Sequence, residues 1–114
     1  MATSTIKGVK KGTITPILTG WTINYAVSGN VVSIWAEHSG SVSFGEWQNV
    51  DIATIPAELR PSKTVLGQMS DTGYAYQTKA QCRPQIEGSG KMLIGVRDAF
   101  TAERVSMYFC YVIG

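Results

Sequence analysis

The fold of this chain is decided by two alternating runs and the turn between them: Thr22-Ile23-Asn24-Tyr25-Ala26-Val27, then Ser28-Gly29-Asn30, then Val31-Val32-Ser33-Ile34-Trp35-Ala36. Large apolar residues recur at every second position, as Ile23 and Tyr25 do in the first run and Val32 and Ile34 in the second. A period of two places alternate side chains on opposite faces of a β-strand. Because Gly and Asn suit the turn, the stretch predicts a β-hairpin with one buried face.

A second hairpin is predicted between residues 74 and 96, and its first strand has an apolar and a polar face. The apolar face carries Tyr74, Tyr76, Ala80, Cys82 and Ile86, and the polar face carries Gln77, Lys79, Gln81, Arg83 and Gln85. Gly88-Ser89-Gly90 then turns the chain onto a strand whose inner residues are Met92, Ile94 and Val96. We expect one face of this hairpin in the core and the other in water.

Four further strands bring the expected total to about eight. They are a short strand near Val42–Phe44, Trp47–Ile55, Val65–Met69 and Val105–Ile113. The last run is apolar on both faces, which is typical of a central strand or of one covered by a second sheet or a subunit. The expected breaks are Ser39-Gly40-Ser41, the loop bracketed by Pro56 and Pro61, the turn Asp71-Thr72-Gly73 and a loop from Ala99 to Ala102.

Helical periodicity is missing over any useful length, so the strands predict an all-β fold. An antiparallel β-sandwich, a jelly roll or a small β-barrel would each accommodate them. A chain of 114 residues fits one domain. We expect residues 12–114 to form that domain, and the polar, basic residues 1–11 to be a flexible arm or the end of an upstream connection.

Composition argues against several functional classes. With 44% hydrophobic and 16% charged residues, the chain predicts a globular protein with few surface charges. The net charge is +2 and the basic residues are dispersed beyond Lys11, so no nucleic-acid-binding face is predicted. No apolar run is long enough to cross a membrane, and the first seven residues lack the apolar core of a signal peptide.

The residues needed for catalysis or metal binding are also missing. Cys82, Cys110 and the single histidine are too few for a zinc site, so we expect neither a metal nor a cofactor. Both cysteines lie in strand-like runs and are expected to be buried free thiols, with a disulfide between them as the alternative. No nucleophile pairs with His38 by spacing and no glycine-rich phosphate loop is present, so no catalytic residue is predicted.

Several segments, taken in order, resemble phage tail-tip proteins. They are Gly12-Thr13-Ile14-Thr15-Pro16-Ile17-Leu18-Thr19-Gly20-Trp21, the turn Ser28-Gly29-Asn30-Val31-Val32, the loop Ile55-Pro56-Ala57-Glu58-Leu59-Arg60-Pro61-Ser62, Val65-Leu66-Gly67-Gln68-Met69 and Gly88-Ser89-Gly90. Over about residues 12 to 114 they look like the head domain of receptor-binding proteins from siphophages of lactococci and related Gram-positive bacteria.

The resemblance implies a homotrimer of β-rich heads at the tail tip of a virion, assembled in the host cytoplasm beside other tail and baseplate proteins. Such heads bind a host cell-wall saccharide, either a polysaccharide or a teichoic-acid-like polymer. A shoulder and a neck precede the head in that family, so residues 1–11 would be the end of a neck. The alternative hypothesis is a structural tail or baseplate component that binds only other virion proteins.

A saccharide site needs an aromatic ring beside amides, carboxylates or guanidinium groups that hold hydroxyls in fixed directions. The candidates are Trp35, His38, Trp47, Tyr74, Arg83, Gln85, Arg97 and Asp98. Trp35 is out of phase with the core residues Ile34 and Ala36, so its ring should meet water or a subunit, unless a second sheet buries it. Trp47 begins a strand, where it either flanks a groove or forms a corner of the core.

The remaining candidates are each consistent with an ordinary structural role as well. His38 lies at a strand end and is either a ligand contact or an exposed polar residue. Tyr74 follows a turn, although its alternation favours the core. Arg83 and Gln85 lie on a face that suits hydroxyls and phosphates but is equally typical of a solvated strand. Arg97 and Asp98, which enter a loop at a strand end, form the best polar pair.

Overall fold

The computed structural model describes residues 9–72 and 82–113. Within these ranges the chain forms eleven β-strands, one 3-10 turn and no α-helix. The strands are β1 (Val9–Ile14), β2 (Trp21–Ser28), β3 (Val31–His38), β4 (Val42–Phe44), β5 (Gln48–Thr54), β6 (Val65–Leu66), β7 (Gln68–Thr72), β8 (Cys82–Ile86), β9 (Lys91–Val96), β10 (Phe100–Ala102) and β11 (Arg104–Val112). The prediction of an all-β fold is confirmed, with more strands than the eight expected.

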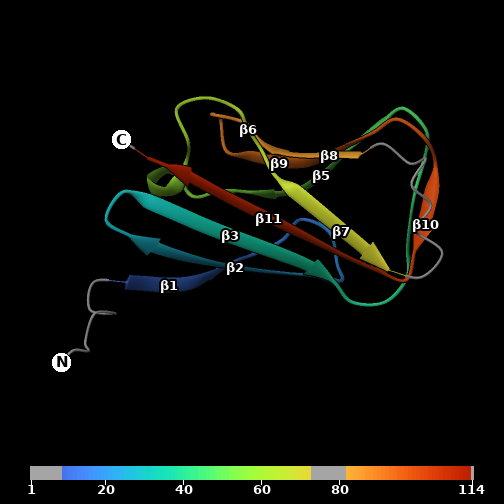
Figure 1. The fold of residues 1–114 in the computed structure, drawn as a ribbon, viewed down its shortest axis with the longest axis horizontal. Coiled ribbons are helices and arrows are strands. Elements are labelled where there is room, and N and C mark those ends of the chain that lie inside the picture. The colour runs from blue at the N-terminus through green and yellow to red at the C-terminus, as the bar shows by residue number, and fades with distance from the viewer. Residues whose placement is uncertain (1–8, 73–81, 114) are drawn as a thin grey trace.

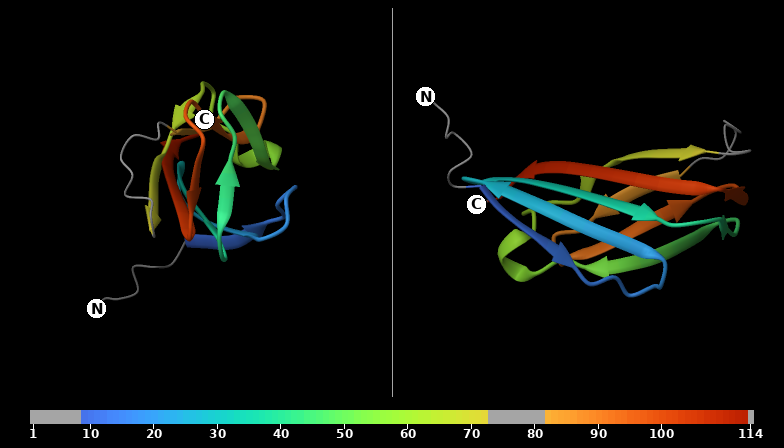
Figure 2. Two further views of the ribbon diagram at one scale, coloured as in Figure 1. Left: turned by 90° about the vertical axis from the view of Figure 1, so that its right-hand side faces the viewer. Right: turned by 90° about the horizontal axis from the view of Figure 1, so that it is seen from below.

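Two antiparallel sheets make up most of the molecule. The five-stranded sheet has the order β1-β2-β3-β11-β7, the four-stranded sheet has the order β5-β9-β8-β6, and β4 pairs with β10 separately. The sheets lie one over the other in Figure 1, and the end-on view in Figure 2 shows their strands arranged around a common interior. Each sheet therefore has an inner face toward the core and an outer face toward solvent.

Most of the core comes from the alternate residues that the periodicity selects; in β5 the neighbours Ile52 and Ala53 are both buried, where the register shifts. At most 1% exposed are Ile23, Val32, Ile34, Ala36, Ile52, Ala53, Ile55, Ile86, Met92, Ile94, Val105, Met107 and Phe109. They come from both sheets and form one cluster. Each fully buried large aliphatic or aromatic side chain stabilises the fold by about 1.5–3 kcal/mol. The β2–β3 and β8–β9 hairpins thus have the predicted buried faces, with Tyr25, Val27 and Cys82 only partly buried at the margin of the core.

The last strand, β11, is central, as its apolar character predicted. It pairs with β3 on one side and with β7 on the other. Its inner residues are buried, but its outer residues Tyr108, Cys110 and Val112 are exposed. Among the described residues, the second sheet therefore covers one face of this strand and leaves the other face exposed.

A glycine lets the chain pass from one sheet to the other. The expected single strand over Val65–Met69 is divided at Gly67, with β6 in the four-stranded sheet and β7 in the five-stranded sheet. The N–H of Gly67 donates to the carbonyl of Pro84 at 2.9 Å. A Cβ at position 67 would lie 2.5 Å from the Phe109 ring and 2.8 Å from the Tyr108 carbonyl oxygen, so any larger residue would displace β11.

Some expected boundaries are wrong because strand pairing overrides local turn signals. Strand β1 begins at Val9, so Val9 to Lys11 lie in the sheet and not in an arm; exposed lysines are tolerated there because β1 is an edge strand. Asp71 and Thr72 continue β7 opposite β11 and do not form the expected turn. The expected loop from Ala99 to Ala102 contains β10, which pairs with β4. The predictions for residues 74–81 lie outside the described residues.

The two cysteines are free, as expected, but they are less buried than expected. Cys82 is half-buried at the start of β8, and Cys110 is exposed on β11. The burial prediction for Cys110 is wrong because its side chain points to the outer face of the five-stranded sheet, opposite Ser33. That face is not covered by another part of the described chain.

A buried hydrogen bond holds the proline-bracketed loop against the sheet. The loop contains the 3-10 turn η1 (Ala57–Leu59), and Leu59 is 5% exposed. The phenol of Tyr111, itself 7% exposed, donates to the carbonyl of Leu59 at 2.5 Å. Burial raises the pKa of Tyr111 from 10.0 to about 12. The neutral, donating phenol is therefore the form that the fold stabilises.

We expect Tyr111→Phe to lower the free energy of unfolding by about 1 kcal/mol at pH 7, because it leaves the Leu59 carbonyl without its donor. The folded-state pKa is raised, so the unfolded chain ionises first. The difference in free energy of unfolding between the wild type and Tyr111→Phe is therefore fully present below pH 10 and falls between pH 10 and about 12. Urea unfolding at pH 7, 9, 10 and 11 measures this difference. Tyr108→Phe, at an exposed tyrosine on the same strand, should change little; equal losses in both variants would contradict the assignment.

Candidate functional site

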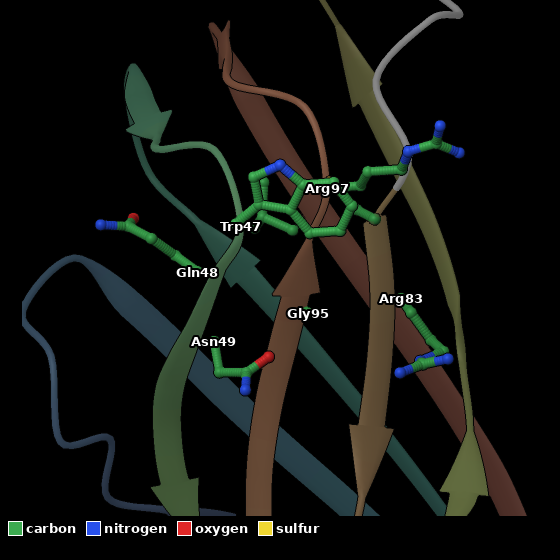
Figure 3. Close-up of a pocket in the computed structure, with 8 residues that line it drawn as sticks. Trp47, Gln48, Asn49, Arg83, Gly95 and Arg97 are labelled. Carbon is green, nitrogen blue, oxygen red and sulfur yellow. The ribbon is translucent and has the colours of Figure 1, made fainter.

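An open hollow of about 640 Å³ lies at one end of the four-stranded sheet, where β5 and β8 begin and β9 ends (Figure 3). It is lined by Trp47, Gln48, Asn49, Cys82, Arg83, Gly95, Val96 and Arg97. Three strands and the loops beside them contribute these residues. The hollow is therefore a product of the sheet and not of one segment.

The floor of the hollow is set by a glycine in the middle strand. Register pairs Asn49 of β5 with Gly95 of β9, and Gly95 with Arg83 of β8, so the three form one row across the sheet. Figure 3 shows Asn49 and Arg83 on opposite sides of Gly95. A Cβ at Gly95 would lie 3.4 Å from Asn49 Oδ1 and 3.7 Å from the Arg83 carbonyl oxygen. Position 95 can thus hold a side chain, and its absence leaves the backbone of β9 accessible.

Trp47 borders the hollow in an unusual backbone conformation. Its φ is +55°, which bulky residues rarely adopt, and its side chain is 74% exposed. Its N–H donates to the carbonyl of Arg97 at 3.2 Å, and the Arg97 guanidinium carbon lies 6.0 Å from the centre of the ring. Just before β5, the N–H of Gly45 donates to Gln48 Oε1 at 3.0 Å and closes the preceding turn. The fold thus holds a large aromatic ring in solvent, and the alternative of a core corner is wrong.

The chemistry of the lining is cationic and rich in hydrogen-bonding groups. Arg83 and Arg97 supply guanidinium groups, and Gln48 and Asn49 supply amides. No carboxylate is among the described residues that line the hollow. An indole face packs on apolar C–H surfaces, amides bind hydroxyls, and guanidinium groups bind hydroxyls or anions. The arrangement is equipped for non-covalent binding of a polar ligand with a flat apolar face.

The structure brings three of the predicted site residues together and separates the others. Trp47, Arg83 and Arg97 all line the hollow. Asp98 does not line it, so of the expected pair of Arg97 and Asp98 only Arg97 contributes to the hollow. Gln85 is also outside the lining, and its amide donates to Glu87 Oε2 at 3.4 Å. The separation arises because Gln85 lies two residues farther along β8, opposite Leu93 instead of Gly95.

Trp35 and His38 belong to the other sheet. Trp35 is 42% exposed on the outer face of the five-stranded sheet, where it pairs with Tyr108. The expectation that its ring meets water or a subunit therefore agrees with its position, and burial under a second sheet is wrong. His38 is half-buried at the end of β3, edge-on to Trp21 with ring centres 5.1 Å apart, and its Nδ1 lies 3.1 Å from the Gly40 carbonyl oxygen. Tyr74 lies outside the described residues.

Sequence reasoning missed the amides and the glycine of the hollow. Gln48 and Asn49 follow Trp47 directly, and two amides beside an exposed aromatic ring are a usable signal once the ring is known to be exposed. Gly95 interrupts an apolar strand, a pattern that marks close backbone approach. Neither signal identifies the strands that lie beside it.

Comparison of the sequence with models of protein families and with curated proteins gives no match. Within residues 9–72 and 82–113, no helix is long and apolar enough to span a membrane. The same residues contain no group of three or more histidine, cysteine or carboxylate side chains placed to hold a metal ion. The chemistry of the hollow and of the two outer faces is therefore what indicates a function.

The backbone conformation of Trp47 predicts that a glycine variant at this position is at least as stable as an alanine variant, the reverse of the usual order of stability. In most strands and loops with negative φ, glycine is less stable than alanine by roughly 0.5–1 kcal/mol. At φ +55° alanine is strained and glycine is not. We expect Trp47→Gly to be at least as stable as Trp47→Ala, as measured by urea unfolding. Because both variants lack the indole ring, the difference in their stability reports on the backbone conformation alone. A glycine variant less stable than the alanine variant would show that residue 47 does not keep its positive φ in solution.

Proposed function

We propose that this domain is the receptor-binding head of a phage tail tip, and that it binds a saccharide of the host cell wall without covalent chemistry. The observation that carries the proposal is the hollow beside Trp47, in which an exposed indole lies next to two amides and two guanidinium groups. Saccharides present flat C–H faces and many hydroxyls, so they need this combination of groups. The order of the sequence segments that resemble siphophage heads supports the same proposal.

The same proposal includes a homotrimeric head of sandwich, jelly-roll or barrel type, carried on the virion beside other tail and baseplate proteins. An open hollow on a sheet surface leaves much of a ligand in water, so each site binds weakly. Several sites on one particle raise the overall affinity without new contacts. A weak site per head is therefore compatible with firm attachment of a virion.

We expect the purified protein to co-sediment with cell walls of a susceptible Gram-positive host, with a dissociation constant per site of roughly micromolar to millimolar. Trp47→Ala should remove most of this binding. Gly95→Ala should weaken it because the added methyl group occupies the floor, while the fold tolerates its Cβ. Trp35→Ala, compared with the wild type at the same oligomeric state by light scattering, is the matched control, because it removes an exposed tryptophan from the other sheet. Loss of binding in Trp35→Ala but not in Trp47→Ala would move the site to the five-stranded sheet.

The second candidate function is a structural tail or baseplate component that binds only virion proteins. It is favoured by the outer face of the five-stranded sheet, where the exposed apolar residues Val31, Trp35, Tyr108 and Val112 come from two neighbouring strands. The Glu37 and Arg104 pair, 3.9 Å apart, lies at one end of these strands. Exposed apolar patches of this kind often mark protein contacts. A protein contact through this face would leave the hollow accessible, since the face and the hollow lie on different sheets.

If this face is a contact between protomers, the wild-type protein should be a trimer in size-exclusion chromatography with light scattering. Tyr108→Glu should then give a folded monomer, because it places a charge in the middle of the contact. Leu66→Glu, which changes an exposed leucine near the edge of the four-stranded sheet, is the control and should remain trimeric. A wild-type monomer at high protein concentration would contradict the assignment of this face to a protomer contact.

A further inference from the structure

We infer that the ligand of the hollow carries a negative charge, a phosphate or a carboxylate on a saccharide, and that this group binds beside Gly95 while a sugar ring packs on Trp47. The inference rests on the proposed function, and it decides between the neutral and the anionic wall polymers that the sequence left open. Three features of the hollow carry it: its charge, its accessible backbone and the separate position of its aromatic ring.

The charge of the hollow has one sign. Arg83 and Arg97 line it, and no aspartate or glutamate is among its described lining residues. The carboxylates nearest in sequence, Glu46 and Asp98, are outside this lining. Arg83 is exposed and takes part in no ion pair within residues 9–72 and 82–113. Two guanidinium groups in a lining that has no carboxylate among its described residues favour an anion over a neutral hydroxyl cluster.

Arg83 differs in this respect from two other arginines of the described chain. Arg104 is also exposed, but its Nε lies 3.9 Å from Glu37 Oε2 on the neighbouring strand. Arg60 donates its Nε–H to the carbonyl of Ile55 at 2.8 Å, a contact within the proline-bracketed loop. Arg83 and Arg97 both line the hollow.

The accessible backbone at Gly95 gives the anion a place to bind. Asn49 and Arg83 lie on either side of Gly95 in one row of the sheet, and Asn49 Oδ1 lies 3.4 Å from where a Cβ at Gly95 would be, so a small group above position 95 meets the Asn49 amide. Figure 3 shows the Arg83 guanidinium pointing away from Gly95, so this long side chain turns toward the group when the ligand binds. Trp47 lies beyond the next row, at the end of β9, where its N–H pairs with the Arg97 carbonyl. Strand neighbours on one face are roughly 7 Å apart along the chain, close to the size of one sugar unit. The charged group and the stacked ring are therefore neighbouring parts of one ligand.

The experiment compares ligands that differ only in charge. N-Acetylglucosamine 1-phosphate, glucuronate, their neutral counterparts N-acetylglucosamine and glucose, and inorganic phosphate are titrated against the full chain, with amide chemical shifts as the readout. We expect either the sugar phosphate or the uronate to bind on the order of tenfold more tightly than its neutral counterpart, and to shift the amide of Gly95. Which of the two binds identifies the anion. The preference should fall as salt is raised from 50 to 500 mM.

The matched variants are Arg83→Gln and Arg104→Gln, which remove the same charge from different sheets. Arg83→Gln should abolish the preference for the charged sugar, and Arg104→Gln should preserve it. Equal binding of charged and neutral sugars, with loss of both in Gly95→Ala, would overturn the anionic ligand but leave the saccharide site intact. Inorganic phosphate binding as tightly as the sugar phosphate would overturn the assignment of a sugar ring to Trp47.

Failure of the proposed function has a different signature. In that case neither the small sugars nor host cell walls bind the wild-type protein, whatever their charge. If the charged sugars do bind, experiments on intact wall polymer distinguish a phosphate ligand from a carboxylate ligand. Host cell walls are tested before and after removal of phosphodiesters with hydrofluoric acid, and before and after reduction of carboxyl groups. Binding that survives both treatments would overturn the inference.

Discussion

The pairing of β11 with β3 is the interaction on which the rest of the structure depends. It joins the end of the chain to the first hairpin over eight residue pairs, from Val105↔His38 to Val112↔Val31. The inner residues of both strands then form the centre of the core, and Phe109 lies against the backbone of Gly67, where the chain changes sheet. Tyr111 reaches Leu59 from the same strand and holds the proline-bracketed loop. One long-range strand pair thus positions the crossover, the loop and the second sheet.

The hollow follows from the same alternation that builds the core. Ile94 and Val96 are buried because they point inward, so Gly95 between them must point outward. Antiparallel register then brings Asn49 and Arg83 to its two sides. The exposed ring of Trp47 depends on a backbone conformation outside the strand, stabilised by its hydrogen bond to Arg97. Core packing and ligand chemistry are therefore properties of opposite faces of one sheet.

The two outer faces of the molecule differ in chemistry, and the proposed functions follow that difference. Around Trp35 and Tyr108 the five-stranded sheet is apolar, as suits contact with protein. The hollow of the four-stranded sheet is cationic and contains amides, as suits a polar ligand. A head that packs through one sheet and binds through the other would keep its ligand site accessible in an assembly. The proposed protomer contact and the proposed saccharide site would then lie on different sheets, so the saccharide site would not have to lie between protomers.

The sequence by itself determined the fold class, both glycine-turned hairpins and the identity of most core residues, because a period of two is a local property of each strand. It also indicated that Trp35 lies out of phase with the core. Only the tertiary structure decided which strands are neighbours, that Val65–Met69 divides at Gly67, and that Ala99–Ala102 contains a strand. It likewise decided that Trp47, Arg83 and Arg97 share a hollow while Asp98 and Gln85 do not line it. These features depend on pairing between residues far apart in the chain, and alternation along one strand carries no information about the strand beside it.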